Sequence, residues 1–165
     1  GIADRLQFRF GYDEDSGLIE KAQVRILVGY PGYLTDVGRS ALGTRKNEPT
    51  VRLYERLEKK KVVHEFGHVL ALRHEHQHPD RRGMLKEDAI IQYFKDKEGW
   101  TSAQTTNAIL KTWGSQERCI GEPNYAVDSI MSYDIPADLT EDNKRIRMAS
   151  RVSRDDLRCV AGLYS

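Results

Sequence analysis

All five histidines of the chain lie between residues 64 and 78. The first two occur in the pattern His-Glu-x-x-His, as His64, Glu65 and His68. On an α-helix, residues i and i+4 lie one turn apart on the same face, so both imidazoles can bind one zinc ion. Glu65 is one position further along, where its carboxylate can reach a metal-bound water without ligating the metal. The spacing therefore predicts a zinc site with an adjacent general base.

His74 is the best candidate for a third ligand, because a catalytic zinc usually has three protein ligands and one open position. In a straight helix, His74 would lie about 15 Å along the axis from His64, too far for one ion to bind both. We therefore expect the chain to leave the helix near residues 70–72 and turn back. Glycine is the usual residue for such a turn, but Ala71 stands there, and a left-handed conformation costs alanine roughly 1 kcal/mol.

Hydrophobic periodicity predicts the elements that position these residues. Val62, Phe66, Val69 and Leu70 have helical spacing and predict a helix across the motif, with lysines 59–61 before it on a solvated face or in a loop. Strands are predicted over residues 6–10, 22–28 and 50–54, with a loop over 35–47. Further helices are predicted over 85–97, from about 101 to 113, and after 153, with an irregular segment over 119–150.

The complete pattern His64-x3-His68-x5-His74 with Glu65 resembles the long zinc signature of the metzincin endopeptidases. The segment His74-Glu75-His76-Gln77-His78-Pro79-Asp80-Arg81 is more narrowly similar to the astacin-like branch, in which a glutamate follows the third histidine. Asp128-Ser129-Ile130-Met131-Ser132-Tyr133 resembles the Met-turn of that branch. The chain departs from the family at Ala71, where glycine is usual, and at His78, where arginine is frequent.

The resemblance implies an α+β fold with two lobes. The N-terminal lobe, about residues 1–74, would hold a twisted mixed sheet and the active-site helix. The C-terminal lobe, about residues 75–165, would be mostly irregular and helical. Together they would form one metalloprotease catalytic domain over residues 1–165, similar to small microbial or fungal members of the group.

The resemblance also implies a zinc-dependent endopeptidase that hydrolyses peptide bonds through a zinc-bound water. One Zn²⁺ would be held by His64, His68 and His74, and Glu65 would act as general base and then as general acid. Tyr133 would be a further metal ligand that swings towards the developing oxyanion; the alternative is an ordinary core tyrosine with a bonded hydroxyl.

Several neighbouring residues receive supporting roles. Met131 is expected to pack beneath the metal, and Glu75 to be a buried structural carboxylate, with a contact to the amine of Gly1 left open. His76 and His78 are expected at the surface or beside the site rather than as ligands. The substrate is expected to be an extended protein or peptide that pairs with strand 50–54 as a sheet edge, the alternative being an ordinary internal strand.

Composition limits the other function classes. With 26 basic and 25 acidic residues, the net charge of +1 argues against a nucleic-acid partner. No apolar run approaches the roughly 20 residues that span a bilayer, so no membrane partner is expected. We expect a secreted monomer, processed because no signal-peptide pattern opens the chain. Cys119 and Cys159 are predicted to form a disulfide, the alternative being two buried thiols.

Two rival functions remain open from the sequence. The first is a non-enzymatic, zinc-stabilised binding module, in which His76, His78 or Tyr133 closes the site as a fourth ligand. The second keeps the zinc chemistry but acts on a peptidoglycan amide or another small amide. An intact Glu65 argues against the first rival, since a structural zinc site has no use for a base.

Overall fold

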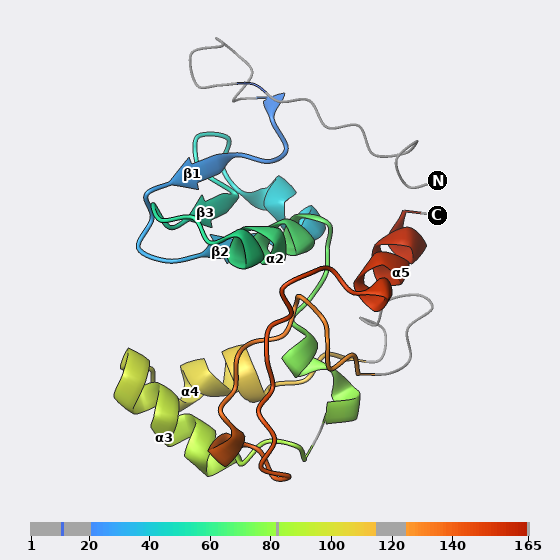
Figure 1. The fold of residues 1–165 in the computed structure, drawn as a ribbon. Coiled ribbons are helices and arrows are strands. Elements are labelled where there is room, and N and C mark those ends of the chain that lie inside the picture. The colour runs from blue at the N-terminus through green and yellow to red at the C-terminus, as the bar shows by residue number, and fades with distance from the viewer. Residues whose placement is uncertain (1–10, 12–20, 82, 115–124, 165) are drawn as a thin grey trace.

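The computed structural model describes residue 11 and residues 21–81, 83–114 and 125–164 (Figure 1). The strand predicted over residues 6–10 lies outside these ranges, as do Gly1 and Cys119. The predicted disulfide therefore stays a prediction, although Cys159 itself is buried in the last helix.

The sheet has the strand order β1-β3-β2 and is mixed. Strand β1 (Ile26–Val28) runs parallel to β3 (Val51–Leu53), and β2 (Leu34–Thr35) runs antiparallel to β3. Sequence patterning located β1 and β3 but did not identify β2, whose Thr35 fell within the predicted loop, because two residues are too few to show a period of two. A 3-10 helix over Gly38–Gly43 lies within the remaining predicted loop.

The prediction that residues 50–54 form the substrate-pairing edge is wrong. Strand β3 is the middle strand and is hydrogen-bonded to a neighbour on both sides, with Val51 and Leu53 buried. The alternative of an internal strand is the one the structure shows. Within the described residues, β2 is the edge that lies on the other side of β3 from β1.

Helix α2 (Lys59–Val69) carries the His-Glu-x-x-His motif and packs against β2 and β3. The lysines at its start form the first helical turn, where the Lys61 Nζ lies 2.7 Å from the Glu58 carboxylate. The apolar stripe that predicted this helix is only half-buried. The buried face of the helix instead consists of His64, Glu65, Gly67 and His68. The two histidines and the glutamate of the motif therefore point into the protein.

In Figure 1, most of the C-terminal half lies on the side of α2 opposite the sheet. It contains 3-10 helices over Glu75–Gln77, Pro79–Arg81 and Ala137–Leu139, helices α3 (Glu87–Glu98), α4 (Ser102–Thr105) and α5 (Arg154–Leu163), and a π-helical turn over Thr106–Leu110. Gly99 ends α3 in the left-handed conformation, with φ 69°. The sequence left Thr101 and Ser102 as alternative caps for the helix near residue 101 and placed Ser153 as the cap of the last helix. In the structure, Thr101 caps α4 and Ser153 caps α5.

One departure concerns the end of a predicted helix. The helical run that begins at Ser102 stops at Leu110, short of the predicted Trp113, because a π turn replaces its last part. Between residues 125 and 150, the chain is mostly irregular, as predicted, with isolated bridges between Leu85 and Thr140 and between Ile135 and Ile146. In the part of the chain that the structure describes, no helix has the length and hydropathy of a membrane span.

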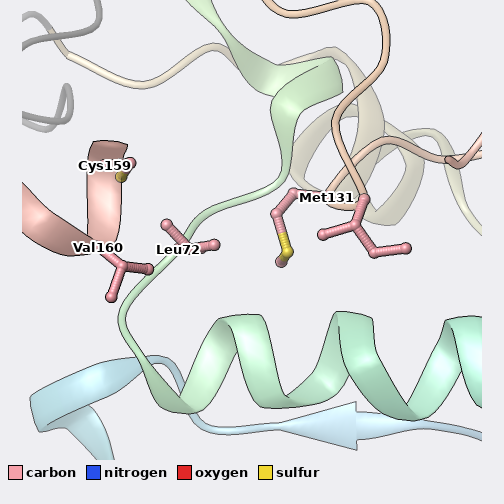
Figure 2. Packing of buried hydrophobic residues seen from close by; sticks show 5 residues of the cluster. Leu72, Met131, Cys159 and Val160 are labelled. Carbon is pink, nitrogen blue, oxygen red and sulfur yellow. The ribbon is translucent and has the colours of Figure 1, made fainter. Parts of the chain in front are cut away.

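Two buried clusters hold these elements together. One joins the end of α2 to α5 and consists of Leu72, Ile130, Met131, Cys159 and Val160 (Figure 2). The other fills the region between α3, the π turn and the 3-10 helix Ala137–Leu139, and consists of Leu85, Ile90, Ile109, Ile135 and Leu139. The first cluster lies directly beside the histidine motif.

Candidate metal centre

The chain leaves α2 just after Leu70, as three converging histidines require. Leu72 N–H bonds to the Gly67 carbonyl at 2.9 Å and Ala71 N–H bonds to the His68 carbonyl at 2.9 Å. These two bonds are the pair that defines a Schellman motif, in which the residue after the C-cap is left-handed. That residue is Ala71, with φ 71°. The predicted turn is present, and an alanine makes it.

A glycine elsewhere gives Ala71 the room for its methyl group. Gly38 lies against this turn, and a Cβ built on Gly38 would stand 2.6 Å from the Cβ of Ala71. Gly38 itself has φ 51°, a conformation that glycine adopts without strain. The absence of a side chain at position 38 therefore allows the two backbone segments to approach closely although residue 71 is an alanine.

Past the turn, His74 comes back to face the two histidines of α2. One ring nitrogen from each of His64, His68 and His74 lies within 4.8 Å of the others. The Nε2 atoms of His68 and His74 are 3.0 Å apart. The structure thus brings together the three residues that the sequence pattern singled out as metal ligands.

Backbone carbonyls orient two of the imidazoles. His64 Nδ1 lies 2.8 Å from the Ile130 carbonyl, and His68 Nδ1 lies 2.8 Å from the Leu72 carbonyl. Since a carbonyl only accepts, both Nδ1 atoms carry the proton, and both Nε2 atoms keep a lone pair directed at the centre of the cluster. A ligating histidine that donates its other ring N–H to a backbone carbonyl is the usual arrangement in metal sites.

Burial keeps these imidazoles neutral, which is the form that binds metal. It lowers the pKa of His64, and together with the neighbouring His64 it lowers the pKa of His68 to about 4. For His74, burial and the neighbouring histidines hold the pKa well below its usual value, and a hydrogen bond with Gln77 only partly opposes them.

A zinc ion fits this donor set. The Nε2 atoms of His68 and His74 face each other at 3.0 Å, so a cation can bind between two lone pairs when His74, like His68, carries its proton at Nδ1. Tetrahedral zinc with Zn–N bonds of 2.0–2.1 Å separates its ligand atoms by about 3.3 Å, close to the spacing seen here. Three neutral imidazoles beside an open pocket are also the ligand type and number of catalytic zinc sites.

Glu65 lies beside the histidines with a buried carboxylate. Burial raises its pKa above the usual value. The neighbouring Thr35 hydroxyl acts in the opposite direction and lowers the pKa of Glu65, which offsets part of the effect of burial. The Thr35 Oγ1 atom itself has no hydrogen-bond partner within the described residues. The Oε2 atom of Glu65 has no hydrogen-bond partner among the described residues. A buried acceptor without a partner is costly, so it marks a position where a donor from a ligand or water belongs.

Met131 packs against α2 because position 67 is glycine. A Cβ on Gly67 would collide with the Met131 sulfur, and Met131 is 1% exposed. Figure 2 shows the Met131 side chain directed at the helix, next to Leu72. Residues 128–133, here called the Met131 turn, therefore lie directly beneath the histidine-bearing turns of α2.

Tyr133 lies at the end of the Met131 turn, among the histidine rings. Its ring centroid is 4.6 Å from that of His74, 6.0 Å from that of His64 and 4.4 Å from that of His76. Burial raises the pKa of Tyr133 to about 12, so its hydroxyl stays protonated at neutral pH. Its role as a metal ligand stays a prediction.

His76 and His78 are not at the surface, which was one of the two positions expected for them. They are 0% and 2% exposed. His76 Nε2 donates to the Ala108 carbonyl at 3.1 Å, and His78 Nδ1 accepts from the Asp80 N–H at 3.1 Å. Each histidine therefore has one nitrogen bonded to the backbone, while His76 Nδ1 has no hydrogen-bond partner among the described residues. Neither residue belongs to the metal-binding group of the described residues.

Glu75 is buried, as expected for a structural carboxylate. Its Oε1 accepts from the Ala126 N–H at 2.7 Å, and its own N–H donates to the Met131 carbonyl at 3.0 Å. Burial raises its pKa to about 7. The possible contact with Gly1 lies outside the described residues.

Two residues that contribute to the site were missed by sequence reasoning. Trp113 Nε1 donates to the His74 carbonyl at 3.1 Å, and Asp156 binds the Met131 turn at Ser129 and Ile130. Asp156 carries a local signal, since Ser153-x-x-Asp156 is a capping box, but that signal marks only the start of α5. Trp113 carries no such signal.

A pocket opens onto the site from solvent. It is lined by residues of the β2 segment, by Glu65 and His68 of α2, and by the chain that follows the turn; its lining residues are Tyr33, Leu34, Thr35, Val37, Glu65, His68, Arg73, His74, Gln77 and Tyr133. The unpartnered carboxylate and the lone-pair side of the histidine cluster therefore face a space that a ligand can enter.

Comparisons with known proteins support this arrangement at the level of the fold. No family model and no curated protein matches the chain. Among solved structures, one of myroilysin aligns with a TM-score of 0.77 at 26% identity over 86% of this chain and 72% of that chain. A second myroilysin structure aligns with a TM-score of 0.55 at 25% identity, over 86% of this chain and 65% of that chain. The predicted α+β fold, with a small mixed sheet beside the histidine-bearing helix, is confirmed as one that this chain shares with myroilysin.

Proposed function

We propose that this chain is a zinc-dependent endopeptidase of the astacin-like type, with one Zn²⁺ held by His64, His68 and His74. One observation carries the proposal: three imidazole nitrogens converge beside a buried carboxylate oxygen of Glu65 that has no partner among the described residues. A site built only for structure needs the first feature but not the second. The structural likeness to myroilysin supports the same class of protein.

Zinc bound here would supply a Lewis acid that polarises the scissile carbonyl and lowers the pKa of a water molecule. Glu65 would accept a proton from the attacking water at Oε2 and deliver it to the leaving amine. The raised pKa of Glu65 suits both roles, because a general base works best when its pKa approaches the operating pH. Burial thus prepares this carboxylate for both steps.

Tyr133 would stabilise the charge that develops on the carbonyl oxygen. Tyr133 lines the pocket, and its hydroxyl remains a donor at neutral pH because burial raises its pKa to about 12. A donor held in a water-poor site before the reaction stabilises an oxyanion more than the uncharged substrate.

The substrate would be an extended segment of a protein or peptide that adds to the sheet at β2. Leu34 and Thr35 of β2 line the pocket beside Glu65, and within the described residues this strand is paired only with β3. Backbone pairing with a sheet edge holds a peptide extended. Single N-methylation of a substrate amide should raise KM at the residues that pair with β2 and not elsewhere; a uniform effect along the peptide would argue against this edge.

The rival function of a closed zinc-binding module finds no fourth ligand in His76 or His78. One nitrogen of each residue bonds to a backbone group, and although His76 Nδ1 has no hydrogen-bond partner among the described residues, neither residue belongs to the group whose nitrogens converge. The remaining candidate, Tyr133, lines the open pocket.

The decisive experiment pairs Glu65→Gln with a matched change on the same helix. Zinc content is measured by mass spectrometry and peptide cleavage with a fluorogenic substrate. Glu65→Gln should retain one zinc per chain and lose about 10²–10⁴-fold in turnover, because the proton acceptor is gone. Zinc-loaded Glu65→Gln with undiminished turnover would end the proposal.

The control is Glu58→Gln, which changes an exposed glutamate beside the first turn of α2. Glu58 contacts Lys61 and not the histidines. It should therefore keep both zinc and turnover. If Glu58→Gln lost activity to the same extent, the effect at position 65 would reflect the helix and not the base.

A further inference from the structure

Asp156 is a buried carboxylate that none of the steps above uses. It lies in the first turn of α5 and is 5% exposed. Its Oδ1 accepts from the Ser129 hydroxyl at 2.6 Å, and its Oδ2 accepts from the Ile130 N–H at 3.1 Å and the Ser153 N–H at 2.8 Å. Only the last of these bonds belongs to the cap of α5.

Ser129 extends this hydrogen-bond network from Asp156 to the peptide unit between Ile130 and Met131. Its hydroxyl has one proton, which it donates to Asp156, and it accepts the Met131 N–H at 2.9 Å. Ser129 is 0% exposed, so solvent water does not compete for these bonds. The short bond to a carboxylate is of the charge-assisted kind, which is about twice as strong as a neutral one.

The peptide unit between Ile130 and Met131 is therefore held at both ends. Its N–H, from Met131, bonds to Ser129 Oγ, and its C=O, from Ile130, accepts from His64 Nδ1 at 2.8 Å. A rotation of this peptide plane would break both bonds together. The direction of the carbonyl that orients His64 thus depends on where Ser129 Oγ lies, and Asp156 determines that position.

We propose that Asp156 is a positioning residue of the metal centre: through Ser129 and the Ile130–Met131 peptide, it sets the orientation and the ring tautomer of His64. This inference rests on the proposed function, because it assigns His64 as a metal ligand. It adds that the C-terminal helix is part of the zinc site, although α5 contributes no ligand.

The alternative role of Asp156 is to cap α5 and nothing more. Two Ser→Ala variants separate these roles, because each serine bonds to a different side of Asp156. Ser129→Ala removes the hydroxyl that joins Asp156 to the Ile130–Met131 peptide, and it leaves the cap and the direct bond from the Ile130 N–H intact. Ser153→Ala removes the hydroxyl that accepts the Asp156 N–H at 2.9 Å and leaves the link intact.

Asp156→Asn gives an independent variant of nearly the same shape. If the Asn oxygen replaces Oδ2, the bonds from Ile130 and Ser153 persist, and the NH2 group then faces Ser129. Ser129 Oγ would have to accept from both sides, and its own proton would lose its partner. This variant should therefore behave as Ser129→Ala does.

Zinc affinity is measured by competition with a chromophoric chelator, using the full chain. Ser129→Ala and Asp156→Asn should bind zinc about 10–100-fold more weakly, the usual loss when a partner behind a ligand is removed. Ser153→Ala should lower the denaturation midpoint and leave zinc affinity within about 3-fold of wild type, because a lost helix cap acts on stability alone.

A second readout keeps this inference separate from the proposed function. In the chain as purified, ¹⁵N NMR of the histidine rings should report His64 protonated at Nδ1 in wild type and Ser153→Ala, and altered in Ser129→Ala. If the wild type bound no zinc, the proposed function would fail, while the NMR comparison would still test the role of Asp156. Wild-type zinc affinity and an unchanged His64 signal in Ser129→Ala would overturn the inference, as would equal losses in both serine variants.

Discussion

Ala71→Gly tests whether the turn after α2 carries backbone strain. Ala71 has φ 71°, and the left-handed region costs a residue with a Cβ about 1–2 kcal/mol, which glycine does not incur. Two losses of stability oppose this gain. The greater freedom of glycine in the unfolded chain costs about 0.4–1 kcal/mol, and removal of a half-buried methyl group costs roughly 0.4 kcal/mol. The expected net effect is a stabilisation of about 0.5 kcal/mol.

Ala161→Gly is the matched control. Ala161 is also half-buried but lies within the right-handed helix α5, so the same atoms are removed without relief of strain. It should destabilise the chain by about 1 kcal/mol, which places the two variants about 1–2 kcal/mol apart. Urea denaturation at a fixed zinc concentration, with equal m-values, measures the difference. If Ala71→Gly lost as much stability as the control, the turn would not be strained.

Further substitutions test how the site is supported. Gly67→Ala should destabilise the chain by about 1–3 kcal/mol, because its Cβ meets the Met131 sulfur, and when Met131→Ala is added the combined loss should be smaller than the sum of the two single losses. Additive losses in a denaturation series would show that the two groups do not touch. Trp113→Phe should cost about 1 kcal/mol through the lost bond to the His74 carbonyl. Unchanged stability of this variant, by the same assay, would mean that the bond contributes nothing.

Local spacing was enough to predict the chemical part of the site. Residues i and i+4 of one helix must share a face, so His64 and His68 could be paired from the sequence alone. The distance argument that His74 requires a turn near residue 71 was also local. It held although Ala71 is not a glycine, because the space for its methyl comes from Gly38, which no local pattern connects to the turn.

Features that depend on contacts between distant segments could not be predicted in the same way. A two-residue strand such as β2 has no measurable period, so β3 could not be recognised as the middle strand. Asp156 lies far along the chain from His64 and acts through Ser129 and the Ile130–Met131 peptide. Its capping box was visible as a helix start, but its second set of partners follows only from the packing of α5 against the Met131 turn.

The most direct test of the central claim is a crystal structure of the zinc-loaded chain, with anomalous diffraction recorded on both sides of the zinc absorption edge. We expect one anomalous peak, about 2.0–2.1 Å from the Nε2 atoms of His64, His68 and His74, with Glu65 beside it and not bound to it. A peak at another group of side chains, or none at these three histidines, would contradict the assignment of this cluster as a zinc centre.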